Sequence, residues 1–307
     1  MSVTVPDIVT QSGPVGQPVK TVLTIDGGGT CGFFSHQILK RLALIEAFDI
    51  DLIVGVSAGA IVGAVLAAGL MSEMDDETIQ MYTLQLFGDE SNKGPWFGPK
   101  YKGATKSTAL HMMFGDLKFG DLQIPMAVLV DRIGNSPELC RSWDPVYMDV
   151  PLVKILDATS AVPVLFPPVT INGEQYIDGG TVTNSPICIG HLVAMEIFAR
   201  DTISLISLGT APRKTPTGAR FDNSEMGIIQ LISLGLPLKV LTQGSSLVNE
   251  LSKNILCPRF IRIEGDVSAR LDDLSIFGQC TEAAESVWTT MESSILGFLS
   301  RTEPTTG

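Results

Sequence analysis

The chain has 307 residues, of which 45% are hydrophobic and 18% charged, and its formal net charge at pH 7 is −12. These values predict a well-buried globular protein of one large domain or two smaller ones. The acidic balance argues against nucleic acid as a partner and against attachment of the whole surface to anionic lipid. Five scattered cysteines and three unpaired histidines indicate buried thiols in a reducing compartment and predict no zinc site.

Residues 1–20 are predicted to form a tail or a loose lead-in to the fold. They lack a basic start and a continuous apolar core, so they do not resemble a signal peptide. Together with the cysteine usage, this predicts a cytoplasmic protein. The turn-forming residues that support the prediction of a tail are Gly13, Pro14, Gly16 and Pro18.

A predicted strand, Thr21 to Ile25, ends in a glycine-rich run. The run reads Asp26-Gly27-Gly28-Gly29-Thr30-Cys31-Gly32. Helical periodicity then begins, because apolar residues recur on one face at Phe34, Ile38, Leu42 and Ile45. The sequence therefore predicts a strand, a glycine loop and an amphipathic helix.

The glycine loop has three functional interpretations. It matches the Gly-x-Gly-x-x-Gly dinucleotide fingerprint, but that site needs an acidic residue at the far end of the second strand, and Asp49 and Asp51 open that strand instead. It resembles the phosphate loop of actin-like sugar kinases, but there the chain continues as a hairpin. It also suits an oxyanion hole, in which successive backbone N–H groups face a developing negative charge. A plain structural turn is the fourth alternative, and the glycines alone leave all four open.

The next strand and helix enclose a Gly-x-Ser-x-Gly sequence. Asp51 to Val56 is short, apolar and β-branched, like a strand buried on both faces, and Ala58 to Leu70 suits a buried helix. Between them lies Gly55-Val56-Ser57-Ala58-Gly59. A strained turn between strand and helix lifts such a serine above the sheet edge, and the helix dipole points toward it. The pattern therefore predicts a nucleophilic Ser57.

A membrane helix is the alternative for this region. Residues 52–72 carry no charge, and Gly55, Gly59 and Gly63 have Gly-xxx-Gly spacing. However, four glycines dilute the apolar run, acidic residues stand at its start, and no lysine or arginine follows its end. These features favour the serine turn.

The middle of the chain contains one basic, aromatic segment. After a predicted helix over Asp75 to Phe87, residues 91–106 read as a loop in which Trp96, Phe97 and Tyr101 stand among four lysines and no acidic residue. In so acidic a chain, such a loop suits an interfacial contact or a lid. An ordinary solvated loop remains the alternative.

The second half of the chain places Asp178 at the end of a strand, directly before Gly179 and Gly180. An isolated Asp-Gly-Gly can simply shape a turn. The other predicted elements are helices at Leu110–Phe114, Leu152–Thr159, Ile187–Arg200, near 225–252 and at Thr281–Leu299, and strands at Ile124–Val130, Ile203–Leu208 and Arg259–Ile263.

Several motifs follow one another along the chain. They are Asp26-Gly27-Gly28-Gly29 with Gly32, Gly55-x-Ser57-x-Gly59, Phe114-Gly115-Asp116, the run 158–168, Asp178-Gly179-Gly180 with Asn184-x-Pro186, and Ser207-Leu208-Gly209-Thr210. Each is weak or moderate singly, but their ordered combination over residues 21–210 is specific. It resembles the patatin-like phospholipase family and disfavours the dinucleotide and kinase interpretations.

The resemblance implies an α/β fold, namely a three-layer α/β/α domain with a mostly parallel central sheet. It also implies a serine–aspartate dyad instead of a triad, with Ser57 as nucleophile and Asp178 as base. By position, Gly27, Gly28 and Gly29 would supply the oxyanion-hole amides, and Gly55, Gly59, Gly179 and Gly180 would support the motifs. The residues agree, because no histidine lies in any motif. An aspartate with an ordinary pKa near ~3.9 is a weak base and must lie within hydrogen-bond reach of the serine.

The implied activity is that of a serine esterase, which would cleave fatty acyl esters of phospholipids or other lipids without a metal or other cofactor. Its lipid substrate would be met at a membrane or micelle surface, through Trp96 and Phe97, and a homo-oligomer is compatible with the sequence. Two alternatives are a latent effector phospholipase that a ligand or assembly activates, and a non-catalytic lipid-binding or storage protein. The family often has a basic residue where this chain has Cys31.

The same reasoning divides the chain into three parts. We expect a single hydrolase domain over residues 21–300, whose motifs lie in 21–210 and whose part over 211–300 is less defined. A C-terminal tail is expected over residues 301–307.

Overall fold

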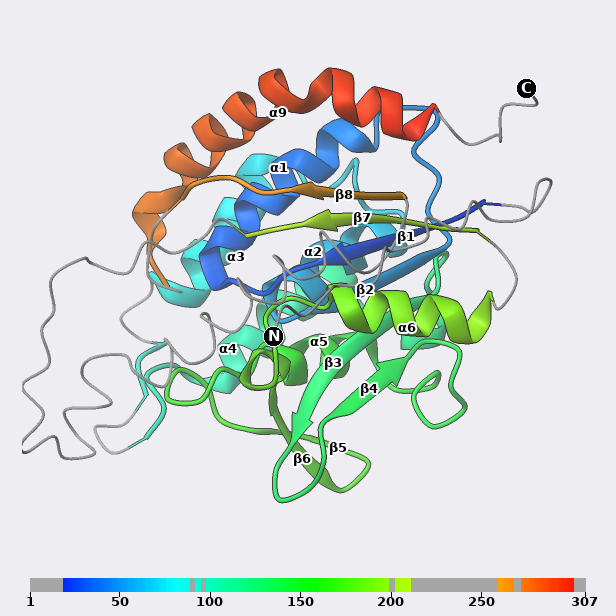
Figure 1. The fold of residues 1–307 in the computed structure, drawn as a ribbon. Coiled ribbons are helices and arrows are strands. Elements are labelled where there is room, and N and C mark those ends of the chain that lie inside the picture. The colour runs from blue at the N-terminus through cyan, green and yellow to red at the C-terminus, as the bar shows by residue number, and fades with distance from the viewer. Residues whose placement is uncertain are drawn as a thin grey trace, which may run out of the picture.

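The computed structural model describes residues 19–88, 92–94, 98–198, 202–210, 259–267 and 272–300. Within these residues the chain forms a mostly parallel sheet between two layers of helices (Figure 1). The α/β/α architecture expected from the resemblance is thereby confirmed. Trp96 and Phe97, the predicted helix near 225–252 and the tail 301–307 lie outside the described residues.

Eight strands of the described residues form one sheet, in the order β5-β6-β3-β2-β1-β7-β8, with β4 paired to β3. In the stretch β3-β2-β1-β7-β8, each strand runs parallel to its neighbour. Strands β4 and β6 run antiparallel to β3, and β5 runs antiparallel to β6. The strands are β1 (Val19–Ile25), β2 (Leu52–Val56), β3 (Met126–Arg132), β4 (Glu138–Arg141), β5 (Val169–Ile171), β6 (Glu174–Asp178), β7 (Thr202–Leu208) and β8 (Arg259–Ile263).

The helices cover both faces of this sheet. Helix α6 packs on one face, and α1, α2, α5 and α9 lie on the other, where α3 and α4 form an outer edge (Figure 1). Their bounds are α1 (Gly32–Leu42), α2 (Ala58–Ala67), α3 (Asp76–Phe87), α4 (Gly103–Phe114), α5 (Leu152–Thr159), α6 (Ile187–Ile197) and α9 (Phe277–Leu299).

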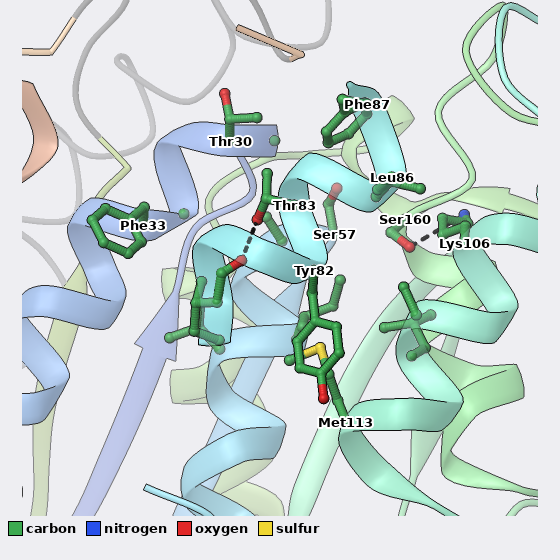
Figure 2. A pocket seen from close by; sticks show the side chains of 18 of the residues that line it. Thr30, Phe33, Ser57, Tyr82, Thr83, Leu86, Phe87, Lys106, Met113 and Ser160 are labelled. Atoms are coloured by element: carbon green, nitrogen blue, oxygen red, sulfur yellow. Dashed lines mark hydrogen bonds between the residues drawn. The ribbon is translucent and has the colours of Figure 1, made fainter. Parts of the chain in front are cut away.

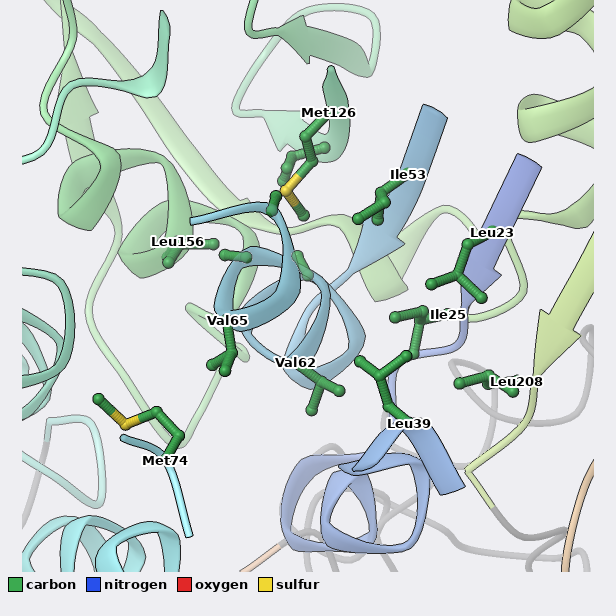
Figure 3. Packing of buried hydrophobic residues seen from close by; sticks show 14 of the residues in the cluster. Leu23, Ile25, Leu39, Ile53, Val62, Val65, Met74, Met126, Leu156 and Leu208 are labelled. Carbon is green, nitrogen blue, oxygen red and sulfur yellow. The ribbon is translucent and has the colours of Figure 1, made fainter. Parts of the chain in front are cut away.

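The two faces are built from alternating residues of the same strands, because successive side chains of a strand point to opposite sides. Leu23 and Ile53 belong to the large cluster under α1 and α2, which Figure 3 shows around Val62 and Leu39. Three of their neighbours in sequence, Val22, Leu52 and Val54, belong to the smaller cluster under α6. Strands buried on both faces explain why β2 is apolar throughout.

Strand β3 brings the ends of two other strands together. It pairs with β2 as far as Leu129, opposite Val56, and with β6 from Val130, opposite Asp178. Strand β4 pairs along one edge of β3 as far as Val130. Strands β2 and β6 therefore both pair along the opposite edge, where their C-terminal ends face each other. Residues that follow β2 and residues that end β6 therefore meet.

Some expected boundaries are corrected. β1 begins at Val19, inside the predicted tail, and α1 ends at Leu42, so that Ile45 lies beyond the helix. Residues 52–72 form β2 and the ten-residue α2, not one long helix. Of the helices described, none has the length and apolar character needed to cross a membrane. Helix α4 begins at Gly103, within the segment predicted as a loop.

Candidate active site

Ser57 occupies a strained turn between β2 and α2. Its backbone lies in an uncommon region, with φ 52° and ψ −128°, which marks a constrained position. The flanking glycines permit this turn, because a Cβ at Gly59 would lie 2.3 Å from the carbonyl oxygen of Ile25, and one at Gly55 would lie 2.6 Å from Cα of Ala60. The local sequence thus folds as the Gly-x-Ser-x-Gly pattern predicts.

The structure brings Ser57 and Asp178 into direct contact. The Ser57 hydroxyl donates to Oδ2 of Asp178 over 2.6 Å, and the N–H of Gly180 donates to the other carboxylate oxygen over 2.6 Å. Both side chains are buried, with residue exposures of 5% and 2%. The backbone after Asp178 therefore orients one oxygen and leaves the other for the serine.

Burial changes the acidity of Asp178. Removal of the carboxylate from water raises its pKa to about 6, although the hydrogen bonds from Ser57 and Gly180 and the charge of Lys106 each lower it in part. A carboxylate with this pKa accepts a proton more readily than an exposed aspartate does. It remains mostly ionised at neutral pH.

Thr159, at the end of α5, supports the serine turn and was not singled out in the sequence. Its hydroxyl accepts a hydrogen bond from the N–H of Ser57 over 3.0 Å and donates to the carbonyl oxygen of Leu129 over 2.6 Å. The threonine thus links the serine turn to β3. Its position in the Ala-Thr-Ser run could have marked it as a site residue. The sequence does not show, however, which backbone groups its hydroxyl is hydrogen-bonded to.

The glycine loop lies beside Ser57, and its three amides are not equivalent. The N–H of Gly27 donates to the carbonyl oxygen of Asn184 over 2.9 Å. In the part of the chain that the structure describes, the N–H groups of Gly28 and Gly29 donate to no protein acceptor. The N–H of Gly27 is thus engaged within the fold, which argues against Gly27 as one of the three expected oxyanion donors.

An apolar pocket opens next to Ser57 between four helices. Figure 2 shows Phe33, Tyr82, Leu86 and Met113 around it. Helix α3 contributes five residues to the wall although none of its own side chains is fully buried. The lining consists of Gly29, Thr30, Gly32, Phe33, His36, Ser57, Ala58, Ile61, Val62, Val65, Ile79, Tyr82, Thr83, Leu86, Phe87, Lys106, Ala109, Leu110, Met113, Ser160, Val162, Leu165 and Phe166.

Lys106 is the charged residue in this lining, and its position shows that the prediction of a loop over residues 91–106 was wrong at this end. It lies on α4 with only 2% of its surface exposed, instead of in a solvated loop. Its ammonium lies 2.9 Å from Oδ1 of Asp157, donates to Ser160 Oγ over 3.3 Å, and stands 4.4 Å from the ring centre of Phe166. Burial lowers the pKa of Lys106, and Asp157 opposes this effect. Tyr101, also assigned to the loop, is buried as well.

The cysteines that the structure describes do not lie together as metal ligands would. Cys31, Cys140, Cys188 and Cys280 form no disulfide among the described residues, and Cys257 lies outside them. Across the described ranges, no three His, Cys, Asp or Glu side chains converge as metal ligands would. Cys31, which stands where the family often has a basic residue, is buried and lines no part of the pocket.

This chain is similar to several known proteins. Protein teg of Priestia megaterium is 31% identical over 228 residues, which cover 68% of this chain and 68% of that protein. The cGAMP-activated phospholipase of Pseudomonas aeruginosa is 28% identical over 190 residues, covering 57% of this chain and 56% of that protein. Among solved structures, VipD from Legionella pneumophila aligns with a TM-score of 0.47 at 14% identity, covering 88% of this chain and 67% of that chain.

The family assignment rests on the sequence match. This chain spans between about half and two thirds of the length of the two curated relatives. Residues 23–189 match the patatin-like phospholipase family, a range that holds Ser57, Asp178 and the glycine loop. Membership implies lipid hydrolase activity. The chain belongs to the patatin-like phospholipase family.

Proposed function

We propose that this protein is a lipid acyl hydrolase that cleaves fatty acyl ester bonds, in phospholipids first of all, through an acyl-enzyme on Ser57. The observation that carries the proposal is the 2.6 Å hydrogen bond from the Ser57 hydroxyl to Asp178 at the wall of an apolar pocket. A nucleophile bonded to its base is the arrangement that covalent catalysis requires.

In the first step, Ser57 Oγ attacks the ester carbonyl carbon while Asp178 Oδ2 takes the hydroxyl proton. The raised pKa of Asp178, about 6, brings the base closer to the working pH, where general bases are most effective. The carbonyl oxygen becomes an oxyanion, which we assign to the N–H groups of Gly28 and Gly29. One such donor contributes about 3–4 kcal/mol to the transition state.

Collapse of the tetrahedral intermediate breaks the bond to the alcohol, which leaves with the proton held by Asp178. A water molecule then attacks the acyl-enzyme and gives its proton to Asp178. Departure of the fatty acid returns that proton to Ser57 Oγ. The dipole at the N-terminus of α2 favours the negative charge in both steps.

The pocket supports a fatty acyl chain as the group that is transferred. Apart from Lys106 at one end, its wall is aliphatic along α2 and α4, from Ala58 to Val65 and from Lys106 to Met113. Each of these stretches extends about 10 Å at the rise of an α-helix. We retain as proposals a substrate met at a membrane or micelle surface, a single domain over 21–300 and a cytoplasmic location.

A latent phospholipase is the second candidate function, favoured by the name of one relative, a cGAMP-activated phospholipase. In that case hydrolysis would begin only after a ligand is added. A cyclic dinucleotide is the first ligand to test, in the assay described next.

The experiment compares the wild type with Ser57→Ala and Asp178→Asn on short- and long-chain p-nitrophenyl esters and on phosphatidylcholine vesicles. Ser204→Ala is the matched control, because Ser204 is a buried serine of β7 whose hydroxyl has no partner among the described residues. We expect turnover in the wild type and control only. Activity that survives Ser57→Ala would contradict the proposal. Vesicle binding without turnover in any protein, with or without a cyclic dinucleotide, would favour a lipid-binding protein.

A further inference from the structure

Arg262 of β8 reaches the glycine loop from a distant part of the chain. Its guanidinium binds both carboxylate oxygens of Asp26, the residue directly before Gly27, over 3.1 and 2.6 Å. We propose that Arg262 is a positioning residue of the active site, which holds the glycine loop in the shape that presents the amides of Gly28 and Gly29 to the oxyanion. This inference rests on the function proposed above.

The contact between Arg262 and Asp26 is buried and directional. Each side chain is 6% exposed. The guanidinium also donates to Ser207 Oγ over 2.6 Å and to Glu264 Oε2 over 3.0 Å, which fixes its plane. A planar, bidentate pair of this kind restricts orientation as well as distance. Arg262 therefore constrains the direction in which the chain leaves β1.

The backbone of the loop is tied to the same side of the sheet. The N–H of Asp26 donates to the carbonyl oxygen of Leu208 over 3.0 Å, and the hydroxyl of Thr210 donates to that of Gly27. A Cβ at Gly28 would lie 2.2 Å from Thr210 Oγ1, so the loop fits closely against the end of β7. These anchors and Arg262 all lie beyond residue 189, where the family match ends.

Charge gives Arg262 a second reason to affect catalysis. A buried carboxylate at Asp26 would repel an oxyanion that forms against the next residues of the loop, and such repulsion is strong where water is excluded. Arg262 neutralises this carboxylate with a charge that arginine keeps at every working pH. Without it, the loop would lose its fixed direction, and Asp26 would either repel the oxyanion or take up a proton, since burial already raises the pKa of Asp26.

A purely structural role for Arg262 predicts a different result from a positioning role. If Arg262 serves only folding, its loss lowers the number of intact sites, while each intact site keeps its turnover rate. If Arg262 positions the loop, the turnover rate of each site falls. Titration of reactive Ser57 with a fluorophosphonate, carried to completion, counts the sites and separates the two cases.

The experiment measures kcat per titrated site and KM for a p-nitrophenyl ester in the wild type, Arg262→Gln, Arg262→Lys and Arg259→Gln. Arg259 is the matched control, because it lies on the same strand and donates instead to the carbonyl oxygen of Phe298 over 3.1 Å. Arg262→Lys keeps the charge but not the bidentate contact. It also serves if Arg262→Gln fails to fold.

We expect kcat per site to fall about 100-fold in Arg262→Gln and about 10-fold in Arg262→Lys, since loss of one oxyanion donor costs 10²–10³ in kcat. KM should stay within about threefold, and Arg259→Gln should match the wild type. Wild-type kcat per site in Arg262→Gln, or in Arg262→Lys if only that variant folds, would overturn the positioning role alone. A wild type without Ser57-dependent turnover or labelling would overturn the proposed function, and this inference with it.

Discussion

Two buried ion pairs lie close to Ser57 and Asp178, and they differ in the cation that pairs with the carboxylate. In the pocket-wall pair, the ammonium of Lys106 lies 2.9 Å from a single carboxylate oxygen of Asp157 and stands over the ring of Phe166. In the loop pair, the guanidinium of Arg262 binds both oxygens of Asp26. Lys106 lines the pocket, whereas neither residue of the loop pair does.

The two pairs therefore affect different properties. The pocket-wall pair affects the pKa of Asp178, and the loop pair affects the shape of the glycine loop. The charge of Lys106 acts on Asp178, whose pKa it lowers after burial has raised it. The charge of Arg262 acts on Asp26, while its planar fork fixes a direction. Loss of the pocket-wall pair should therefore change the pH dependence of the reaction, and loss of the loop pair its rate at every pH.

The largest expected effect concerns Asp178, the group that the pocket-wall pair influences. Asp178→Asn should lower kcat about 10⁴-fold, because the serine loses its proton acceptor. It should also stabilise the fold at pH 8. The pKa of Asp178 is raised from 3.8 to about 6, so the folded protein loses stability as the pH rises through this window, by about 2–3 kcal/mol in all.

Urea unfolding at pH 8 and pH 4 measures this gain. Asp178→Asn should exceed the wild type at pH 8, and the difference should shrink at pH 4, where the folded wild type holds a protonated carboxyl group. Ser204→Ala, which leaves the carboxylate in place, should show no such dependence on pH. Equal stability of Asp178→Asn and wild type at pH 8 would mean that burial of the carboxylate is not costly.

The next effect compares the two pairs directly at alkaline pH. Lys106→Met should lower kcat by about tenfold or less, since Asp157 keeps its hydrogen bond from Ser107. Arg262→Gln should lower kcat about 100-fold. Kinetics with one ester at pH 8.5 test the ratio. Lys118→Met, which removes an exposed lysine paired with Asp149, is the control. A larger loss in Lys106→Met than in Arg262→Gln would reverse the assignment of tasks.

A pH profile sharpens the same comparison. Because Asp178 must be ionised to accept a proton, kcat/KM of the wild type should rise with pH through about 6, the pKa of its carboxyl group. Lys106→Met removes a charge that lowers this pKa, so its rise should move to higher pH. Arg262→Gln should keep the rise near pH 6 and reduce only the plateau. Identical profiles in all three proteins would contradict the role given to Lys106.

The smallest expected effect belongs to Thr159, which is part of neither pair. Thr159→Val keeps the shape but leaves the buried N–H of Ser57 without its acceptor, which should destabilise the fold by about 1–3 kcal/mol. Turnover per site should fall only a few-fold. Thr159→Ser keeps the hydroxyl and should restore both values in thermal unfolding and kinetics. Full stability of Thr159→Val would show that this hydrogen bond contributes little.

The sequence predicted those features that depend on residues adjacent in the chain. The turn at Ser57 and the position of Asp178 at a strand end follow from residues that adjoin them in the chain, and α5 has the predicted bounds. The sites that the sequence missed depend on distant partners. Arg262 was recognised only as part of a strand, because its carboxylate partner lies 236 residues away.

Local signals were weak where the fold was misjudged. Helix α4 begins with Gly103, a poor helix former, and its N-terminus has no side-chain cap. The buried Lys106 was therefore assigned to a loop. Strands β4 and β5 contain only four and three residues, too few to show a periodic pattern. The amide of Gly27 could not be separated from its neighbours, since its acceptor is a backbone carbonyl.

The shared edge of β3 has a consequence for tolerance to insertions and deletions. Leu129 and Val130 pair with the ends of β2 and β6, so the register of β3 sets the separation of Ser57 and Asp178. One residue added there would displace Asp178 by about 3.3 Å and reverse the faces of every side chain beyond it. Under the proposed mechanism, such a change would abolish turnover without altering any reacting group.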